Sequence, residues 1–88
     1  MPSTAVSTLT IKVLVFASYA ETLGFEDVEL ALDAPATVAD ALRRLRVLPG
    51  GERLPPTPLC ALNLSQVSAH AALADGDELA ILPPLAGG

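Results

Sequence analysis

Apolar and polar positions alternate along two early stretches of the chain, and alternation with a period of two predicts β-strands. Residues 8–16 are rich in β-branched side chains and end in an uninterrupted apolar run from Val13. This run predicts a central strand that is covered on both faces. In residues 28–33, apolar side chains alternate with polar or small ones, so we expect a second strand with one buried and one wetter face.

A longer amphipathic helix is predicted after the second strand. Thr37 and Asp40 have the spacing of a capping box, and the apolar residues that follow recur at i, i+3, i+4 and i+7 along one helical stripe. The C-terminal end of this helix carries Arg43, Arg44 and Arg46, where cations complement the helix dipole. We therefore interpret these arginines as a solvated face rather than as an anion site.

A shorter helix is expected directly after the first strand. Ser18 and Glu21 form another capping pair, in which each side chain satisfies a free backbone amide. Gly24 can then close the helix after one or two turns, because glycine adopts the left-handed conformation at low cost.

Strand signals resume after a proline-rich segment. Residues 49–58 contain four prolines and two glycines, so we interpret them as a surface loop without regular structure. Residues 59–62 predict a short buried strand and residues 66–67 an edge fragment, and the Asp75-Gly76 turn leads into a strand over residues 78–82. The pattern predicts an α+β domain in which the main helix packs across one face of a mixed sheet of four to five strands.

Length and composition fit one small domain. The chain has 88 residues, of which 51% are hydrophobic and 17% charged. A chain of this size hides roughly 60–65% of its unfolded surface on folding, which leaves little interior for a deep substrate cavity. We expect a disordered leader over residues 1–7, a globular domain over residues 8–82 and an extended tail over residues 83–88.

Net charge narrows the class of partners. Ten acidic residues against five basic ones give a net charge of −5, which disfavours nucleic acid and anionic membranes and favours a partner with basic patches. No stretch approaches the roughly 20 apolar residues that span a bilayer. The apolar run after Lys12 is also shorter than the roughly 7–15 residues of a secretion signal, so we expect a cytoplasmic protein.

The chain has one cysteine, Cys60, and one histidine, His70. A structural zinc site or an internal disulfide needs more ligands or thiols, so we expect folding without a metal or a disulfide. Cys60 lies in an apolar run and is interpreted as a small core residue, whereas His70 is interpreted as a surface residue. The spacing of the carboxylates does not indicate paired acid-base catalysis.

One face of the predicted sheet should stay uncovered. The first and last strands carry apolar residues on both faces, and one helix covers only one of them. We expect an exposed apolar patch that includes Leu82, Phe16 and Leu14, and we expect a partner subunit to bury it.

The C-terminus carries the candidate chemistry. Pro83 and Pro84 stiffen the chain beyond the last strand, and Gly87 and Gly88 finish it. Glycines can thread a channel too narrow for any Cβ atom and present the terminal carboxylate at its end. Taken alone, the same residues also fit a frayed glycine end.

Residues 75–88, DGDELAILPPLAGG, resemble the ending of molybdopterin synthase small subunits, the ubiquitin-like sulfur carriers of molybdenum cofactor synthesis. Further resemblance lies in VLVFA at residues 13–17, in ATVADAL at residues 36–42 and in ALN at residues 61–63. The resemblance covers essentially everything after Ser7, and it implies the ubiquitin-like β-grasp fold.

The resemblance implies that Gly88 is the reactive residue. Its carboxylate would be adenylated by a partner enzyme that uses ATP and then converted to a thiocarboxylate. The tail residues Gly87, Ala86, Leu85 and Pro84 would insert into the large subunit of the synthase. Two sulfurs would pass there to a cyclic pterin precursor to form the dithiolene.

The resemblance also implies the partners. The catalytic side chains would belong to the large subunit, so this chain would be a sulfur donor that binds no cofactor and no metal of its own. The complex would be a heterotetramer of two small and two large subunits. The second partner would be the adenylating and sulfurylating enzyme.

Three alternatives stay open. A carrier with the same tail can serve thiamine synthesis, tRNA thiolation or cysteine synthesis, although thiamine carriers typically join their first two strands by a tight turn. A ubiquitin-like modifier would join Gly88 to target lysines, and the single lysine, Lys12, lies in a predicted central strand, which disfavours self-chains. A plain interaction module with an inert tail is the third.

The chain also departs from the family pattern in the first helix. It has Ser18-Tyr19-Ala20 where many relatives carry a basic residue.

Overall fold

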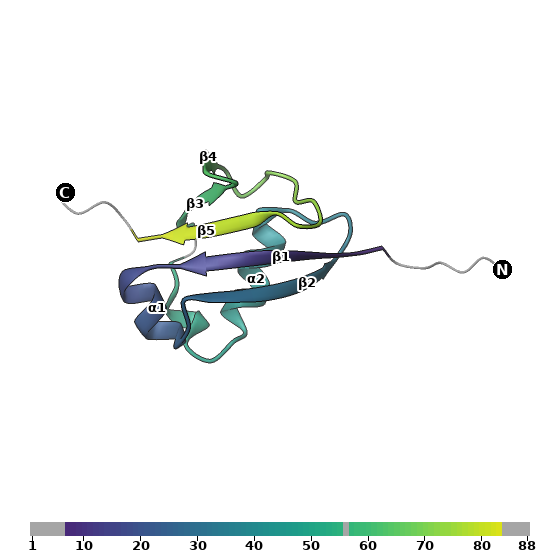
Figure 1. Cartoon of the computed structure of the whole chain (residues 1–88). Helices are drawn as coiled ribbons and strands as arrows, with labels where there is room; N and C mark the ends of the chain where they lie inside the picture. Colours follow the sequence, from purple (N-terminus) through teal and green to yellow (C-terminus); the bar gives the residue numbers. More distant parts are fainter. Residues whose placement is uncertain (1–6, 56, 84–88) are drawn as a thin grey trace.

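A mixed sheet runs through the molecule (Figure 1). The computed structural model describes residues 7–55 and 57–83. The strands of this part of the chain are β1 (Thr8–Val15), β2 (Asp27–Asp33), β3 (Leu59–Leu62), β4 (Ser65–Val67) and β5 (Glu78–Leu82). They lie in the order β2-β1-β5-β3-β4, with β1 and β5 parallel and the other neighbours antiparallel.

The helices lie behind the sheet and at one end of it (Figure 1). The main helix, α2 (Val38–Arg46), packs across the sheet, and α1 (Ala17–Leu23) follows β1. This arrangement confirms the predicted α+β architecture, with five strands in the sheet. Within the described residues, no helix is long and apolar enough to cross a membrane.

β1 is an interior strand, but only one of its faces is covered. Leu9, Ile11 and Val13 are buried, whereas Lys12 between them is exposed. The expectation that both faces are covered is therefore wrong. The apolar run indicated two covered faces because it includes Leu14. Leu14, however, lies on the open face of the sheet and is only half-buried there.

The core lies between the sheet and α2. Its most deeply buried large side chains come from β1, β5 and α2 and are each less than 2% exposed: Ile11, Val13, Val38, Leu45, Leu79 and Ile81. Full burial of an aliphatic side chain stabilises a fold by about 1.5–3 kcal/mol relative to leaving it exposed. These contacts hold β5 against β1 and fix the direction in which the chain leaves the sheet.

The predicted capping box of α2 is confirmed. The Oδ2 atom of Asp40 accepts a hydrogen bond from the backbone N–H of Thr37 at 2.7 Å and one from its hydroxyl at 3.2 Å. The backbone N–H of Asp40 bonds the Thr37 side chain in return, so two backbone amides at the start of the helix are satisfied.

The three arginines of α2 make contacts within the domain. The exposed Arg44 donates from Nη1 to the carbonyl oxygen of Ala31 on β2 at 3.0 Å. Arg43, also exposed, pairs with Asp40. Arg46 is half-buried and donates to a carbonyl oxygen of the following loop. Their contacts are thus with solvent, with nearby carbonyl groups and, for Arg43, with the Asp40 carboxylate.

α1 begins before the predicted capping pair. Its first residue is Ala17, and Phe16 is the N-cap, with no side chain capping the helix. The capping pair of Ser18 and Glu21 is therefore wrong, because Ser18 already lies inside the first helical turn. Gly24 closes the helix in the left-handed region at φ 85°, as predicted.

The proline-rich segment contains a turn of helix. Gly51–Arg53 form the 3₁₀-helix η1, so the expectation of no regular structure in residues 49–58 is wrong. The flanking prolines lie outside this three-residue turn and do not interrupt it. Leu54, which follows η1, is only 3% exposed and anchors the segment in the core.

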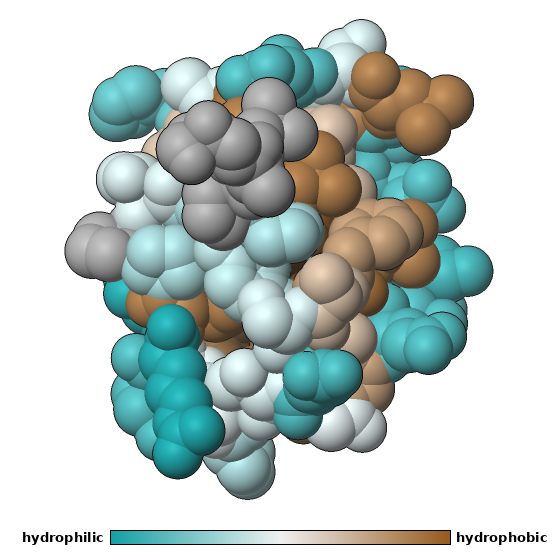
Figure 2. Space-filling model, turned by 90° about the vertical axis from the view of Figure 1, so that its left-hand side faces the viewer, coloured by the Kyte–Doolittle hydropathy of each residue, from teal (hydrophilic) through white to brown (hydrophobic). Residues whose placement is uncertain are grey.

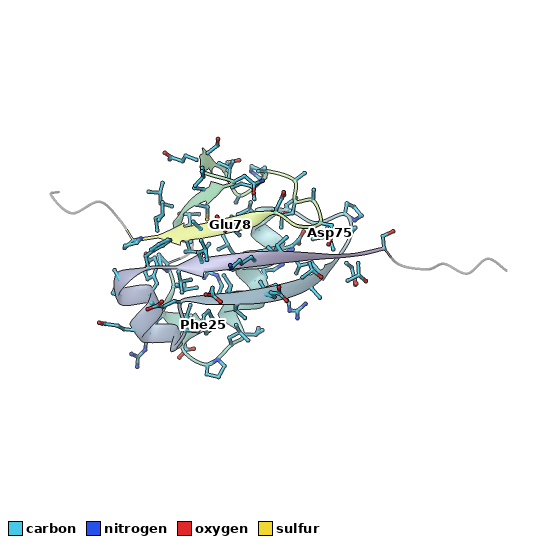
Figure 3. All side chains as sticks on the ribbon, in the orientation of Figure 1. Phe25, Asp75 and Glu78 are labelled. Atoms are coloured by element: carbon cyan, nitrogen blue, oxygen red, sulfur yellow. The ribbon has the colours of Figure 1, made fainter. Side chains whose placement is uncertain are left out.

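The remaining strand predictions are confirmed in outline, with β4 at the edge of the sheet. Gly76, at φ 88°, forms the turn before β5. Asp75 beside it accepts a hydrogen bond from the backbone N–H of Thr10 at 2.7 Å (Figure 3). The predicted leader lies outside the described residues except for Ser7, whose carbonyl oxygen accepts a hydrogen bond from Ala34 at 2.8 Å.

Cys60 lies on β3 with its side chain in the core. It is 2% exposed, and its Sγ donates to the carbonyl oxygen of Pro58 at 3.4 Å. Burial raises the pKa of the Cys60 thiol, because a thiolate loses its hydration in apolar surroundings. The interpretation of Cys60 as a core residue is confirmed.

We expect Cys60 to make stability depend on pH in alkaline solution. The contribution of the protonated thiol is complete below the pKa of the unfolded chain, about 8.5. It is lost as pH rises through the higher pKa of the folded state. Urea unfolding across this range should show a steeper alkaline loss of stability for wild type than for Cys60→Ala. Parallel pH profiles would contradict the assignment.

Gly51 packs against the backbone of α2, where a Cβ atom would overlap the carbonyl oxygen of Leu45. Because a backbone atom cannot rotate away, Gly51→Ala should lower the free energy of unfolding by about 3 kcal/mol. Gly24→Ala is the matched control, since open space surrounds Gly24 and only its left-handed φ is penalised, by about 1–2 kcal/mol. Chemical denaturation measures both, and equal losses would show that the contact is unimportant.

Candidate functional site

β5 brings the chain to one end of the sheet. It lies between β1 and β3, with Ile81 beside Val15 and Leu82 beside Leu59. Pro83 is the last residue of the described part. The predicted tail residues lie outside the described residues: Pro84, Leu85, Ala86, Gly87 and Gly88. The site that the structure does describe is the surface around the end of β5.

An apolar patch lies beside the end of β5 on the open face of the sheet. The register places Ala80 between Leu14 and Ala61, and residues in register point to the same face. We name this surface the outer apolar patch and define it by Leu14, Phe16, Leu59, Ala61, Ala80 and Leu82. Figure 2 looks onto this end of the molecule and shows apolar side chains in brown and tan gathered on its right-hand side.

All three residues that the sequence placed on an exposed apolar surface belong to this patch. Phe16 is 44% exposed, and Leu14 and Leu82 are half-buried. The sequence did not identify the other three members, Leu59, Ala61 and Ala80. They join the patch only through the pairing of β3 with β5, which the sequence alone does not reveal. A period-two pattern within each strand is the only sequence signal that points to them.

The backbone at the end of β1 presents Phe16 to solvent. Phe16 is extended, with φ −129° and ψ 156°, and Ala17 after it has φ 51° in the left-handed region. A residue other than glycine is disfavoured there by roughly 1–2 kcal/mol, so the surrounding structure must hold this turn. The turn sends the chain into α1 and leaves the Phe16 ring on the surface.

Carboxylates border the patch on β2 and at the start of β5. Lys12 lies in register with Glu29 and with Glu78, which is labelled in Figure 3, and Asp27 lies in register with Leu14. All the arginines belong to α2 and η1, in the helical layer. The open face therefore has an apolar centre and an acidic border, which is complementary to an apolar surface with a basic rim.

The carboxylates near the start of β5 fix a turn. The two side-chain oxygens of Asp77 accept hydrogen bonds from Asn63 Nδ2 at 3.0 Å and from the backbone N–H of Ala74 at 2.8 Å. Asn63 Oδ1 in turn accepts one from the backbone N–H of Glu78 at 3.0 Å. In residues 7–55 and 57–83, no three histidine, cysteine, aspartate or glutamate side chains gather in a way that could hold a metal ion.

A groove of about 750 Å³ opens in the helical layer beside β4. We name it the edge groove, and its main lining residues are Tyr19, Leu42, Pro58, Cys60, Val67 and His70. His70 is exposed, as predicted, and Cys60 is buried. Sequence reasoning predicted no such groove, because its walls come from segments that are far apart along the chain.

The chain is similar to known proteins along most of its length. The model of the ThiS family matches residues 13–88. A molybdopterin synthase sulfur carrier subunit from Arabidopsis thaliana is 35% identical over 83 residues, which are 93% of this chain and 86% of the relative. The protein of that name from Escherichia coli (strain K12) is 36% identical over 85 residues, covering 89% of this chain and 99% of the relative.

Solved structures agree with the fold. SAMP1 from Haloferax volcanii superposes with a TM-score of 0.77 at 31% identity, covering 90% of this chain and 99% of its own. A chain from the complex of subunits 1 and 2 of molybdopterin-converting factor from Helicobacter pylori 26695 has a TM-score of 0.66 at 21% identity, covering 91% of this chain and 100% of its own. The second likeness shows the fold alone.

These neighbours and the five-stranded mixed sheet confirm the predicted ubiquitin-like β-grasp fold. The family match begins at Val13, within β1, includes all of β5 and continues to the last residue. The similarity is thus spread over the whole domain rather than confined to one motif. The chain therefore belongs to the ThiS family and is a relative of molybdopterin synthase sulfur carrier subunits.

Proposed function

We propose that this chain is the sulfur carrier subunit of a molybdopterin synthase. The observation that carries the proposal is its alignment with relatives of that name over 86–99% of their length. The family match extends through Gly88 and so includes the tail. Helix α1 between β1 and β2 also favours this branch over thiamine carriers, which typically have a tight turn there.

In this proposal Gly88 supplies the reactive group. A free carboxylate is a poor acyl donor, so it must first be activated. Attack of the Gly88 carboxylate on the α-phosphate of ATP releases pyrophosphate and forms an acyl adenylate. Sulfur at the oxidation level of hydrosulfide then displaces AMP and leaves a thiocarboxylate. Its sulfur attacks a carbon of the cyclic pterin precursor and displaces an oxygen substituent, and water then cleaves the acyl–sulfur bond and releases the Gly88 carboxylate. Two such transfers supply both sulfurs of the dithiolene.

The tail delivers this group, and partner proteins supply the other chemistry. Gly87 and Gly88 lack Cβ atoms and fit a narrow channel, while Pro84 stiffens the chain behind them. Leu85 and Ala86 extend the contact along the channel. The adenylating and sulfurylating enzyme binds ATP, and the large subunit holds the acid-base groups. The chain is thus a non-catalytic sulfur donor without a cofactor of its own.

The outer apolar patch is the proposed docking surface for the large subunit. It lies beside the end of β5, so a partner that covers it also receives the tail. We expect the interface to bury at least roughly 1,000 Å². A chain of the same fold occurs in a complex of subunits 1 and 2 of molybdopterin-converting factor, which supports a partner subunit for this chain. We propose a cytoplasmic heterotetramer of two small and two large subunits.

The similarity to SAMP1, a small archaeal modifier protein, favours a second candidate function. The same activated carboxylate would then form an isopeptide bond with lysines of other proteins. Lys12, the single lysine of this chain, is exposed on the open face of the sheet. Intact-mass analysis of protein from its native host, with identification of co-purifying chains, separates a thiocarboxylated subunit from a lysine-linked modifier.

Adding one residue after Gly88 should abolish activation and sulfur transfer. The carboxylate is then displaced by about 3.3–3.6 Å, whereas attack geometry tolerates errors below about 1 Å. Deletion of Gly88 should have the same effect. Pyrophosphate release with the adenylating enzyme and ATP measures the first step, and sulfur transfer with the large subunit measures the second.

The melting temperature serves as the control for both tail variants. It should change little, because one terminal residue buries little apolar surface. Sulfur transfer at the wild-type rate by the extended chain would contradict the carrier mechanism.

Phe16→Asp should weaken binding to the large subunit about 30-fold, the equivalent of roughly 2 kcal/mol for an aromatic residue at the centre of an interface. Val47→Asp is the matched control, because Val47 is also an exposed apolar side chain but follows α2, away from the patch. Calorimetric titration of each variant with the large subunit gives the comparison. Similar affinities for the two variants would show that the patch is not part of the docking surface.

A further inference from the structure

The edge groove is an apolar hollow that the proposed sulfur chemistry does not use. Its volume of about 750 Å³ lies within the roughly 300–1,000 Å³ typical of ligand sites. Cys60 is buried beside it, and Val67 on the edge strand β4 is half-buried. No carboxylate side chain is among its described lining residues, although the chain carries a net charge of −5.

The register of the sheet places this groove at the end of the molecule where β5 ends. Val67 lies in register with Cys60, and Cys60 lies in register with Ile81, the next-to-last residue of β5. Tyr19 reaches the groove from α1, which lies at the same end of the sheet (Figure 1). The chain that continues after Leu82 therefore starts two strands away from Val67.

The segment after Pro83 is long enough to reach the groove. Neighbouring strands are about 4.8 Å apart, so the distance from β5 to β4 is about 9.6 Å. Residues 84–88 span up to about 17 Å when extended. The leader, by contrast, adjoins Thr8 at the opposite end of β1 (Figure 1).

The chemistry of this segment matches the lining. Leu85 is its one large apolar side chain, and Tyr19, Leu42 and Val67 offer an apolar wall for it. The terminal carboxylate of Gly88 needs hydrogen-bond donors when it leaves bulk water. The groove supplies them in the imidazole of His70 and in the hydroxyl groups of Thr57 and Ser68.

We propose that the edge groove is a docking site for the chain's own C-terminal segment, residues 84–88. Leu85 occupies the apolar part of the groove, and the Gly88 carboxylate lies at its polar rim near His70. The docked segment exchanges with a released one, and only the released form enters a partner. If the proposed function holds, docking shields the activated carboxylate from water between partners, so this consequence rests on that function.

Docking also lowers the apparent affinity for a partner that binds the released tail. The apparent dissociation constant rises by the inverse of the released fraction. A partner that covers the outer apolar patch would compensate for this loss through its own contacts. The edge groove and a partner bound to the outer apolar patch therefore compete for the same tail from opposite faces of the sheet.

The test compares Val67→Glu with Val47→Glu in the full-length chain. The new carboxylate in the groove should repel the C-terminus, whereas the same change at the 78% exposed Val47 leaves the groove intact. Backbone ¹⁵N relaxation should show the amides of residues 85–88 ordered in wild type and in Val47→Glu. In Val67→Glu they should show the fast motion of a free chain end.

Ala69→Glu, at another lining position, provides a second disruption if Val67→Glu does not fold. Equal fast motion of residues 85–88 in wild type and in the groove variants overturns the proposal. Order that disappears on dilution also overturns it, because the groove would then bind the tail of a second copy. The measurement uses neither ATP nor a partner, so its outcome is independent of the proposed sulfur chemistry.

Discussion

The parallel pairing of β1 with β5 is the constraint on which the rest of the structure depends. It joins segments that are 65 positions apart at the hydrogen bond from the backbone N–H of Thr10 to the Asp75 carboxylate, and the backbone N–H of Lys12 donates to the Asp77 carbonyl oxygen at 2.9 Å. Closing so long a loop costs conformational entropy, which the burial of side chains such as Val13 and Leu79 offsets. Because parallel strands end on the same side, β5 ends beside Phe16 and α1.

One face of the sheet is covered by a helix, and the other is exposed to solvent. α2 covers the inner face, and its residue Leu45 is completely buried there. A domain of 88 residues has no second layer for the other face among the residues described, so Leu14 and Leu82 stay half-buried. Apolar area left in water at the end of β5 favours association with a partner.

The distribution of charge restricts which partner can use that face. The arginines remain in the helical layer, where Arg44 binds the Ala31 carbonyl oxygen and Arg43 pairs with Asp40. Lys12 is the single basic residue of the strands and lies in register with two glutamates. An acidic partner would be repelled at this border, whereas a basic one would gain attraction as it approached.

Local sequence patterns were sufficient to predict the features that depend on short-range contacts. The capping box of Thr37, the turn at Gly76 and the alternation of residues 28–33 each act over a few residues, so local patterns predicted them correctly. The family resemblance predicted the fold, and it also implies Gly88 as the reactive residue, which stays a prediction because Gly88 lies outside the described residues. The cap of α1 was wrong because Phe16, the residue directly after β1, is already the N-cap of the helix, and that position depends on where β1 ends in the sheet.

Which side chains come together depends on the pairing of distant segments and could not be predicted from local patterns. The outer apolar patch brings Leu14 and Leu59 together through strand order and register, which pairing between distant segments establishes. The edge groove likewise needs α1, α2 and β4 in their final positions. A sequence pattern reports which face of a strand is apolar, but it does not report what covers that face, because coverage depends on contacts between residues far apart in the chain.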